Sequence, residues 1–165
     1  MPIPNIIQPD FIYITTEIRL RKYNGKAEFA LYWYQDEETL MLVDGKSNSY
    51  DIARLNRMYT YLDNHGELYF IEYKVNDRYI EIGDVTFSKE DIPIVIGNKE
   101  YRGLGIGKKV VLKLIERGKA LGYTKLFVKE IYNYNIGSQK LFEGIGFKKY
   151  EETPKGYRYS LELNK

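Results

Sequence analysis

The segment YRGLGIGKK, residues 101–109, brings three glycines and three basic side chains to what reads as the start of a helix. A helix N-terminus carries roughly half a positive charge, so a cation there costs about 0.3–1 kcal/mol. Its first N–H groups lack helical acceptors, and glycines permit positive φ angles and close backbone approach. A bound anion would accept from these N–H groups and attract Arg102, Lys108 and Lys109. The segment therefore predicts a site for a phosphorylated ligand; the alternative is a tight turn with solvated lysines.

Two familiar phosphate-binding motifs do not fit this segment. A dinucleotide-binding fingerprint needs a third glycine where the chain has Lys108. A P-loop needs serine or threonine after its Gly-Lys pair, and here Gly107 and Lys108 are followed by Lys109. The segment therefore does not favour dinucleotide redox chemistry or nucleotide hydrolysis.

The composition narrows the chemistry further. The 165-residue chain has no cysteine, which excludes disulfides, thiolate metal sites and a cysteine nucleophile. Its only histidine, His65, stands in a loop-like context, so we expect no metal site. A net charge of +2 does not indicate nucleic-acid binding. Because the sequence has neither a membrane-length apolar run nor a signal-peptide pattern, we expect one cytoplasmic domain, residues 1–165, with no membrane partner.

Hydrophobic periodicity and turn residues predict the elements that would position the glycine segment. The expected helix there runs from about Gly105 to Leu121, with one apolar stripe facing the core. The other expected elements are a strand at 17–23, two short helices within 25–43, a helix within 49–66, a hairpin at 67–87, a strand at 91–97, a strand at 125–132, a helix at 135–146 and a hairpin at 147–163.

The element order predicts an α/β fold with a central, mixed, mostly antiparallel sheet of about seven strands, flanked by helices. The hairpins require antiparallel pairs. The strand–helix–strand unit around residues 105–121 predicts one parallel pair.

Two sequence blocks resemble one known family. RGLGIG, residues 102–107, resembles the R/Q-x-x-G-x-G/A signature of the Gcn5-related N-acetyltransferase (GNAT) superfamily. Residues 133–147 resemble that family's N-x-x-A-x-x-L-Y-E-x-x-G-F segment, with matches at Asn135, Leu141, Glu143, Gly146 and Phe147. The element order also agrees. Among the branches of the family, the sequence most resembles the one that acetylates ribosomal proteins, polyamines or aminoglycosides.

The resemblance implies acetyl-coenzyme A (acetyl-CoA) as donor and an amine as acceptor, with no metal, and it allows a homodimer. It implies that the strand around Ile94, Val95 and Ile96 splays from strand 125–131 and pairs with the pantetheine arm. Pro93 fits a poorly paired strand, although an edge or bulge without ligand explains it equally. From the following helix, Asn135, Ser138 and Phe142 would face the donor, and Asn135 also suits a plain helix N-cap. The pyrophosphate would be held by Lys108 and by the backbone of Arg102, Gly103, Leu104, Gly105, Ile106 and Gly107.

Without a cysteine, direct attack of the amine on the thioester is the economical mechanism. An alkyl amine with a pKa of about 10.4 is only about one part in a thousand neutral at pH 7, so its proton needs an acceptor. Asp91, Glu72 and Glu81 are the candidate bases, and Asp91 is favoured because it opens the strand with the pantetheine contacts. The amide of Val95 would stabilise the thioester oxygen as it gains negative charge.

One position departs from the family pattern. The family tyrosine that protonates the leaving thiolate corresponds to Phe142, which cannot donate a proton. Tyr134 or Tyr132 would have to substitute, or the thiolate would leave unassisted. This departure motivates an alternative function, a non-catalytic domain that binds or senses acyl-CoA. A separate acidic run at residues 36–38 would attract a cationic amine or is simply a solvated face.

Overall fold

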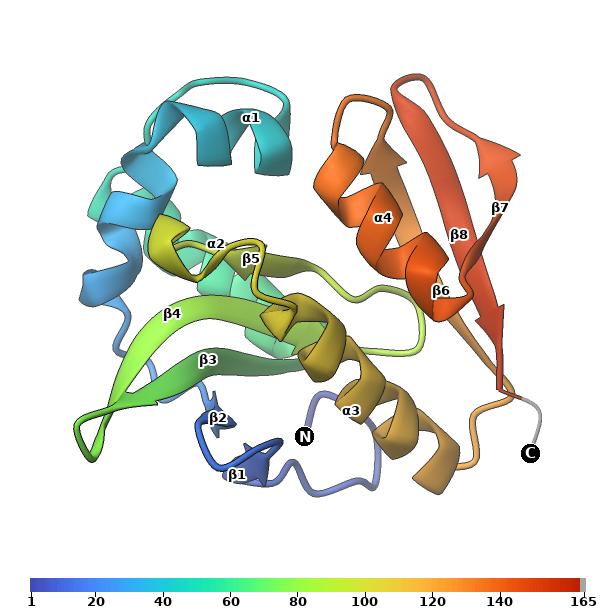
Figure 1. Cartoon of the computed structure of the whole chain (residues 1–165), viewed down its shortest axis with the longest axis horizontal. Coiled ribbons are helices and arrows are strands. Elements are labelled where there is room, and N and C mark those ends of the chain that lie inside the picture. Colours follow the sequence, from blue (N-terminus) through green and yellow to red (C-terminus); the bar gives the residue numbers. More distant parts are fainter. Residues whose placement is uncertain (164–165) are drawn as a thin grey trace. The chain divides into compact units, whose positions relative to one another are not determined.

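The computed structural model describes residues 1–163 and divides the chain into two compact units (Figure 1). The N-terminal unit is made of Met1–Thr86 and Ile94–Leu104. The C-terminal unit is made of Phe87–Pro93 and the chain from Gly105 onward. In the sequence, the boundary between the two units falls within the glycine turn, after Leu104, and the second motif block belongs to the C-terminal unit.

A five-stranded sheet forms the N-terminal unit, in the order β1-β2-β3-β4-β5. The β1/β2, β2/β3 and β4/β5 pairs are antiparallel. The two turn residues between β3 and β4, Asn76 and Asp77, both have positive φ (50° and 65°), as a tight hairpin turn requires. The predicted hairpin is therefore confirmed. The strands are β1 (Phe11–Tyr13), β2 (Ile18–Lys22), β3 (Glu67–Val75), β4 (Arg78–Phe87) and β5 (Ile94–Ile96).

The two α-helices of the N-terminal unit begin where aspartate side chains cap them. The predicted break in residues 25–43 falls at Asp36, whose carboxylate accepts from the N–H of Thr39 at 2.9 Å. It separates the 3₁₀ helix η1 (Glu28–Gln35) from α1 (Glu37–Asp44). Asp51 caps α2 (Ile52–His65) in the same way, and a short 3₁₀ turn, η2 (Lys99–Tyr101), follows β5.

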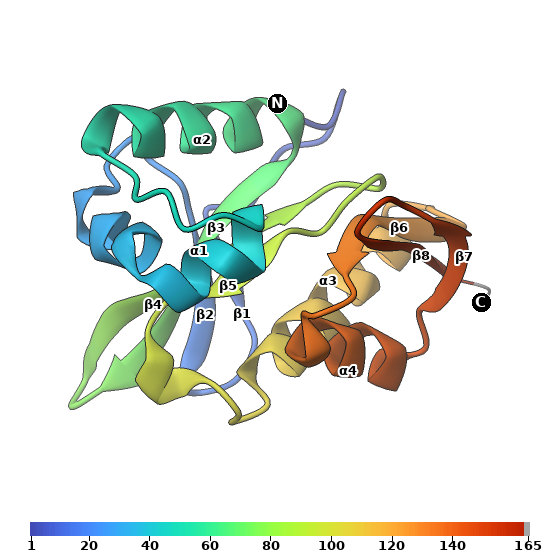
Figure 2. The ribbon, with the colours of Figure 1, turned by 90° about the horizontal axis from the view of Figure 1, so that it is seen from above.

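Aromatic side chains fill the core of this unit. Tyr59 on α2 packs edge-on against Phe70 on β3, with ring centroids 5.4 Å apart. Phe29 on η1 packs against the same Phe70 ring at 4.8 Å. The core therefore joins η1, α2 and β3 (Figure 2).

The C-terminal unit combines a three-stranded antiparallel sheet, in the order β6-β8-β7, with two helices that contact each other. The helix after the glycine turn, α3, buries the predicted stripe of Val110, Val111, Leu114, Ile115 and Gly118. The elements are α3 (Ile106–Ala120), β6 (Lys125–Tyr132), α4 (Ile136–Ile145), β7 (Lys148–Glu152) and β8 (Gly156–Glu162).

The predicted α/β architecture, with mostly antiparallel strands flanked by helices, is confirmed, but the strands of residues 1–163 number eight and form two sheets. The expected parallel pair is wrong as a hydrogen-bonded ladder within residues 1–163, because β5 and β6 belong to different sheets. Instead, the segment before β5 bonds to β6: the N–H of Phe127 donates to the carbonyl of Lys89 at 3.0 Å. No helix within the described residues is long and apolar enough to cross a membrane.

Candidate functional site

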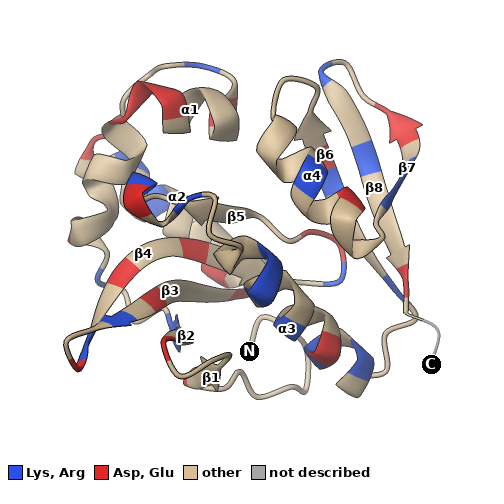
Figure 3. Ribbon diagram, in the orientation of Figure 1, with Lys and Arg blue, Asp and Glu red and all other residues tan. Residues whose placement is uncertain are grey.

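The glycine turn before α3 has the conformation that an anion site needs. Gly103 and Gly105 adopt left-handed φ angles of 73° and 80°, and both are exposed. Gly105 is the N-cap of α3, so no side chain accepts from the first N–H groups of the helix. The first turn of α3 contains no acidic residue, and its Lys108 and Lys109 are exposed. Figure 3 shows basic colouring at the start of α3. The backbone donors and the two lysines are therefore available to a negatively charged ligand.

The side chain of Arg102 is engaged elsewhere, contrary to the expectation that it would attract the anion. Its Nε donates to the carbonyl of Ile96 at 2.7 Å. Its two terminal nitrogens donate to Glu38 Oε1 at 2.9 Å and to Thr39 Oγ1 at 2.8 Å. The guanidinium therefore ties the end of β5 to α1.

Lysine and arginine also neutralise most of the acidic run at residues 36–38. Lys99 Nζ lies 2.8 Å from Asp36 Oδ1, and this contact, with the hydrogen bonds from Thr39, lowers the pKa of Asp36 to about 2. Glu38 is paired with Arg102. These two carboxylates are therefore occupied by the protein's own cations, which removes most of the support for the run as an attractor of a cationic amine.

Replacing Arg102 with alanine should lower the free energy of unfolding by about 1–2 kcal/mol, because three hydrogen bonds of a partly buried guanidinium are lost. Urea denaturation measures the change. Lys99→Ala is the matched control: it removes one exposed ion pair, which is worth about 0–1 kcal/mol. Equal losses in the two variants would contradict a special role for Arg102.

The neighbouring strands β4 and β5 approach each other unusually closely at Gly83. Gly83 is paired with Ile96, Asp84 with Val95 and Val85 with Ile94. A Cβ atom on Gly83 would lie 2.1 Å from the carbonyl oxygen of Val95, so only glycine fits there. The three β5 residues are half-buried, and β5 is an edge of its sheet.

Opposite Val95 stands Asp84, a carboxylate that the sequence analysis did not single out. It is 2% exposed, and its Oδ2 accepts from the hydroxyls of Tyr34 at 2.6 Å and Tyr59 at 2.8 Å. Burial raises the pKa of Asp84 to about 6, against the opposing effect of these two hydrogen bonds. The feature of the sequence that could have identified Asp84 is a single acidic residue within an apolar strand run, IGDVTF.

Two of the predicted bases belong to a structural ion-pair network. Glu72 is 3% exposed, and its two oxygens accept from Arg19 Nε at 2.6 Å and Arg21 Nε at 2.7 Å. Glu81 lies 3.2 Å from the same Arg21. Both oxygens of Glu72 therefore already face cations, which gives this carboxylate a clear structural role.

Asp91, the favoured candidate, stabilises the backbone of the C-terminal unit. Its Oδ1 accepts from the N–H of Lys129 at 3.0 Å, next to the irregularity in the β6/β8 pairing. Its own N–H and carbonyl oxygen both bond to the Ser88 hydroxyl at 3.1 Å. Burial raises the pKa of Asp91, and the Lys129 N–H opposes the rise. The carboxylate thus satisfies a strand N–H that the ladder leaves unpaired.

The second motif mainly shapes α4. Asn135 caps the helix by accepting from the N–H of Ser138 at 3.1 Å. Phe142 is 2% exposed and packs edge-on against Phe147 at 5.2 Å, which makes it a core residue. Glu143 accepts from the hydroxyl of Tyr159 at 2.7 Å. These contacts hold α4 in place whether or not the protein catalyses a reaction.

The two candidate replacements for the family tyrosine lie together just before α4. The rings of Tyr132 and Tyr134 stack with centroids 5.3 Å apart, and Tyr134 is 45% exposed. Tyr132 is half-buried, so Tyr134, with the more exposed ring, stays the better of the two predicted proton donors.

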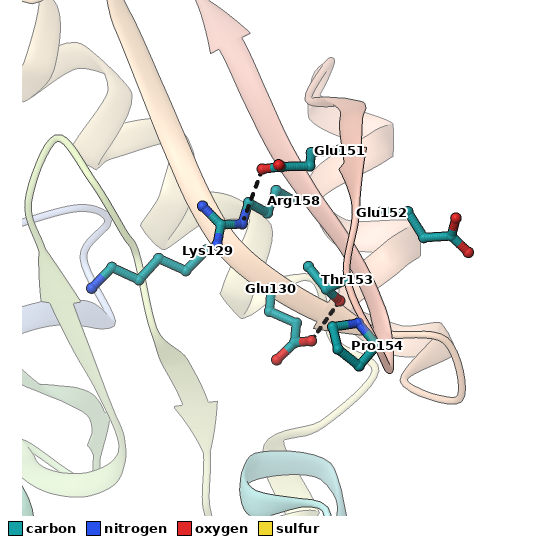
Figure 4. Close-up of a pocket in the computed structure, with 7 residues that line it drawn as sticks. All are labelled: Lys129, Glu130, Glu151, Glu152, Thr153, Pro154 and Arg158. Carbon is teal, nitrogen blue, oxygen red and sulfur yellow. Dashed lines mark hydrogen bonds and ion pairs between the residues drawn. The ribbon is translucent and has the colours of Figure 1, made fainter.

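A surface hollow of about 350 Å³ lies on the three-stranded sheet and its β7–β8 turn (Figure 4). Thr153 Oγ1 donates to Glu130 Oε2 at 2.5 Å, and Arg158 Nε lies 3.3 Å from Glu151 Oε1. None of the residues that the sequence analysis predicted for the site lines this hollow. Its lining is Lys129, Glu130, Glu151, Glu152, Thr153, Pro154 and Arg158.

Residues 15–147 match the sequence profile of the Acetyltransferase (GNAT) family, which is four-fifths of the chain. The chain therefore belongs to this family. A segment of 57 residues is 39% identical to Protein SPT10 of Saccharomyces cerevisiae, and it covers 34% of this chain and 9% of that much longer protein.

Solved structures agree in fold. A domain from Methanocaldococcus jannaschii DSM 2661 superposes with a TM-score of 0.77 and 22% identity, covering 88% of this chain and 98% of that one. A GNAT acetyltransferase from Bacillus anthracis gives a TM-score of 0.74 and 17% identity, covering 94% and 99%. The microcin C7 self-immunity acetyltransferase MccE, solved with acetyl-CoA and AMP, gives 0.72 and 21%, covering 93% and 97%.

Proposed function

We propose that the protein is an acetyl-CoA-dependent N-acetyltransferase that transfers an acetyl group directly to a primary amine of a small molecule or a protein N-terminus. The observation that carries the proposal is the open glycine turn at the start of α3, with two exposed lysines and no capping side chain, in a chain of the GNAT family. The similar MccE structure contains acetyl-CoA, and an aminoglycoside acetyltransferase of the same fold was solved with coenzyme A.

The residues at the turn and on β5 suit the two halves of the donor. A Cβ on Gly103 or Gly105 would meet no atom within 4 Å, so the turn is open to a ligand's diphosphate. We assign this diphosphate to the backbone N–H groups of residues 102–107 and to Lys108. On the open edge of β5, the backbone groups that no strand of its sheet uses would bond the amides of the pantetheine arm. Arg102 already occupies the carbonyl of Ile96, so Ile94 and Val95 are the main candidates.

The transfer would proceed without a covalent enzyme intermediate, since the chain has no cysteine. The amine nitrogen attacks the thioester carbonyl carbon, the C–N bond forms, the C–S bond breaks, and the thiolate leaves with the bonding electron pair. The N–H of Val95 would stabilise the developing oxyanion. A thiol with a pKa of about 8.5 is a tolerable leaving group, and Tyr134 is the residue we assign to protonate it.

Calorimetric titration with acetyl-CoA, followed by thiol-release assays with putrescine, spermidine, kanamycin and a peptide with a free N-terminus, tests the proposal. We expect micromolar donor binding and amine-dependent release of coenzyme A. No binding at millimolar donor would contradict it. Tight binding with no turnover would instead support the non-catalytic acyl-CoA domain, which the buried Phe142 favours.

Lys108→Ala should change stability and donor affinity in opposite directions. Without donor, the variant should be slightly more stable, by about 0.3–1 kcal/mol, because a cation at a helix N-terminus is unfavourable. Its donor affinity should fall about tenfold, because a charge-assisted bond to the diphosphate is lost. Thermal unfolding and calorimetry measure the two effects.

The matched control is Lys119→Ala, which removes the same charge from the last turn of the same helix. This variant should be slightly less stable, because a cation suits a helix C-terminus, and its donor affinity should be unchanged. A similar response of both variants would mean that the lysines at the start of α3 are merely solvated.

A further inference from the structure

Asp84 is a buried carboxylate that has no counter-ion among the described residues 1–163. Its hydrogen bonds come from the neutral hydroxyls of Tyr34 on η1 and Tyr59 on α2, both to Oδ2. Among the ion pairs within residues 1–163, none involves Asp84. In contrast, the equally buried Glu72 is held by two arginines. A buried charge without a cation is costly, so this position is unusual for a residue that serves folding alone.

A second polar group lies on the same face of β4. Thr86 is 4% exposed, and its Oγ1 has no hydrogen-bond partner in the part of the chain that the structure describes. Because side chains two residues apart on a strand point to the same side, Thr86 and Asp84 share one face. A buried hydroxyl left unpaired costs about 1–3 kcal/mol. Asp84 and Thr86 therefore offer two hydrogen-bond acceptors on one face of β4, and within the described residues no group donates to both.

This polar pair lies where the proposed reaction needs a base. Asp84 is directly opposite Val95, and Thr86 continues β4 one residue past Val85, which is opposite Ile94. The strand bearing Val95 and Ile94 is the one assigned above to the donor's pantetheine arm. The acidic group thus stands beside the strand that would carry the acetyl group.

We propose that Asp84 and Thr86 bind the amino group of the acceptor, and that Asp84 takes the first proton that the nitrogen loses. The inference rests on the proposed function. A primary ammonium has three N–H donors, and the Asp84 carboxylate and the Thr86 hydroxyl oxygen supply acceptors for two of them. The Asp84 carboxylate first takes one proton from the ammonium, which frees the lone pair of the nitrogen. The neutral amine then attacks the thioester carbonyl carbon, the C–N bond forms, the thiolate leaves with the C–S electron pair, and the second proton that the nitrogen loses passes to solvent. Tyr34 and Tyr59 act as positioning residues that hold the carboxylate.

The pH dependence of kcat/KM can identify Asp84 as the base, because the groups around it do not ionise in the same pH range. Tyr34, Tyr59 and Tyr50, whose ring lies 5.2 Å from that of Tyr34, have their pKa values raised by burial and so stay neutral from pH 5 to 9. Ile94, Val95 and Ile96 on β5 do not titrate. Asp84, with its pKa of about 6, is therefore the group that ionises in this range.

In the wild type, kcat/KM for the amine should fall below pH 6 and level off above pH 7, because an ionised Asp84 accepts the protonated amine directly. In Asp84→Asn, only the neutral amine reacts, so kcat/KM should rise about tenfold per pH unit toward the amine pKa of about 10.4. At pH 7 its value should be about 10²–10⁴-fold lower. Donor affinity by calorimetry should be unchanged.

Asp63→Asn on α2 is the matched control, since it removes one carboxylate from the same unit and should keep the wild-type profile. Wild-type turnover with an unchanged profile in Asp84→Asn would overturn this inference and leave the proposed function standing. Absence of donor binding and of turnover in the wild type would overturn both.

If Asp84→Asn does not fold, Thr86→Val tests the same inference. Removing an unpaired buried hydroxyl should leave the protein as stable as the wild type or more stable, because the desolvation penalty disappears. The same change should raise KM for the amine about tenfold with little effect on donor affinity. Unchanged kinetics in a folded Thr86→Val would contradict the inference.

Discussion

Replacing Gly83 with alanine should lower the free energy of unfolding by about 3 kcal/mol or more and weaken donor binding with it. The added Cβ would lie 2.1 Å from the carbonyl oxygen of Val95 and 3.1 Å from the Cα of Ile96. These are backbone atoms, so a side-chain rotation cannot relieve the overlap. β4 and β5 must move apart, and the pairing that sets Asp84 opposite Val95 is lost.

Urea denaturation and acetyl-CoA calorimetry measure the two effects of Gly83→Ala. Gly144→Ala is the matched control, because a Cβ at this position within α4 meets no atom within 4 Å. The control should be neutral or more stable by up to about 1 kcal/mol, since alanine is the better helix former. A Gly83→Ala protein as stable as the wild type would show that the close approach of β4 and β5 is not required.

The stability of the wild type relative to Asp84→Asn should fall by about 3 kcal/mol between pH 3 and pH 7.5. The folded-state pKa of Asp84 is about 6, and that of an unfolded aspartate is near 3.8. Below about pH 3 the carboxyl is protonated in both states and costs nothing. As the pH rises from about 3.8 to 6, the unfolded state ionises while the folded state keeps its proton, and above pH 6 the folded state must bury a charge. The raised pKa therefore becomes a destabilisation at neutral pH.

Guanidinium denaturation of both proteins at half-unit pH steps gives this difference directly. Comparing the two proteins cancels the titration of other groups, including Asp91, whose pKa burial also raises. Asparagine still accepts a hydrogen bond from the tyrosine hydroxyls, so the comparison isolates the charge. A constant difference across the range would mean that Asp84 is not desolvated in the folded protein.

Local sequence patterns predicted the positions of most elements. The hairpin turn at Asn76–Asp77, the break at Asp36 and the helix after the glycine turn all depend on contacts within a few residues. The three-residue strand β1 was missed, because so short a segment has no periodicity to detect. Seven residues of η1, EFALYWY, showed helical spacing but form a 3₁₀ helix, a difference that spacing alone does not reveal.

The roles of charged residues were predicted less well than the positions of helices and strands, because each role depends on partners far away in the sequence. Glu72 was a candidate base, but in the structure it is paired with two arginines that lie more than fifty residues earlier in the chain. Asp91 bonds to Lys129, thirty-eight residues later. Arg102 was expected to face the anion, yet its partner Glu38 lies sixty-four residues away.

The sequence by itself determined the family, through the glycine segment at residues 102–107 and the block at 133–147, and it determined the left-handed glycine turn that begins α3. These features are local, since φ angles and helix ends follow from neighbouring residues. Only the tertiary structure decided which acid is buried without a cation, because burial and pairing are properties of the packed chain. It brought the hydroxyls of Tyr34 and Tyr59, which are 50 and 25 residues away in the sequence, to the Asp84 carboxylate, and it set Asp84 opposite Val95.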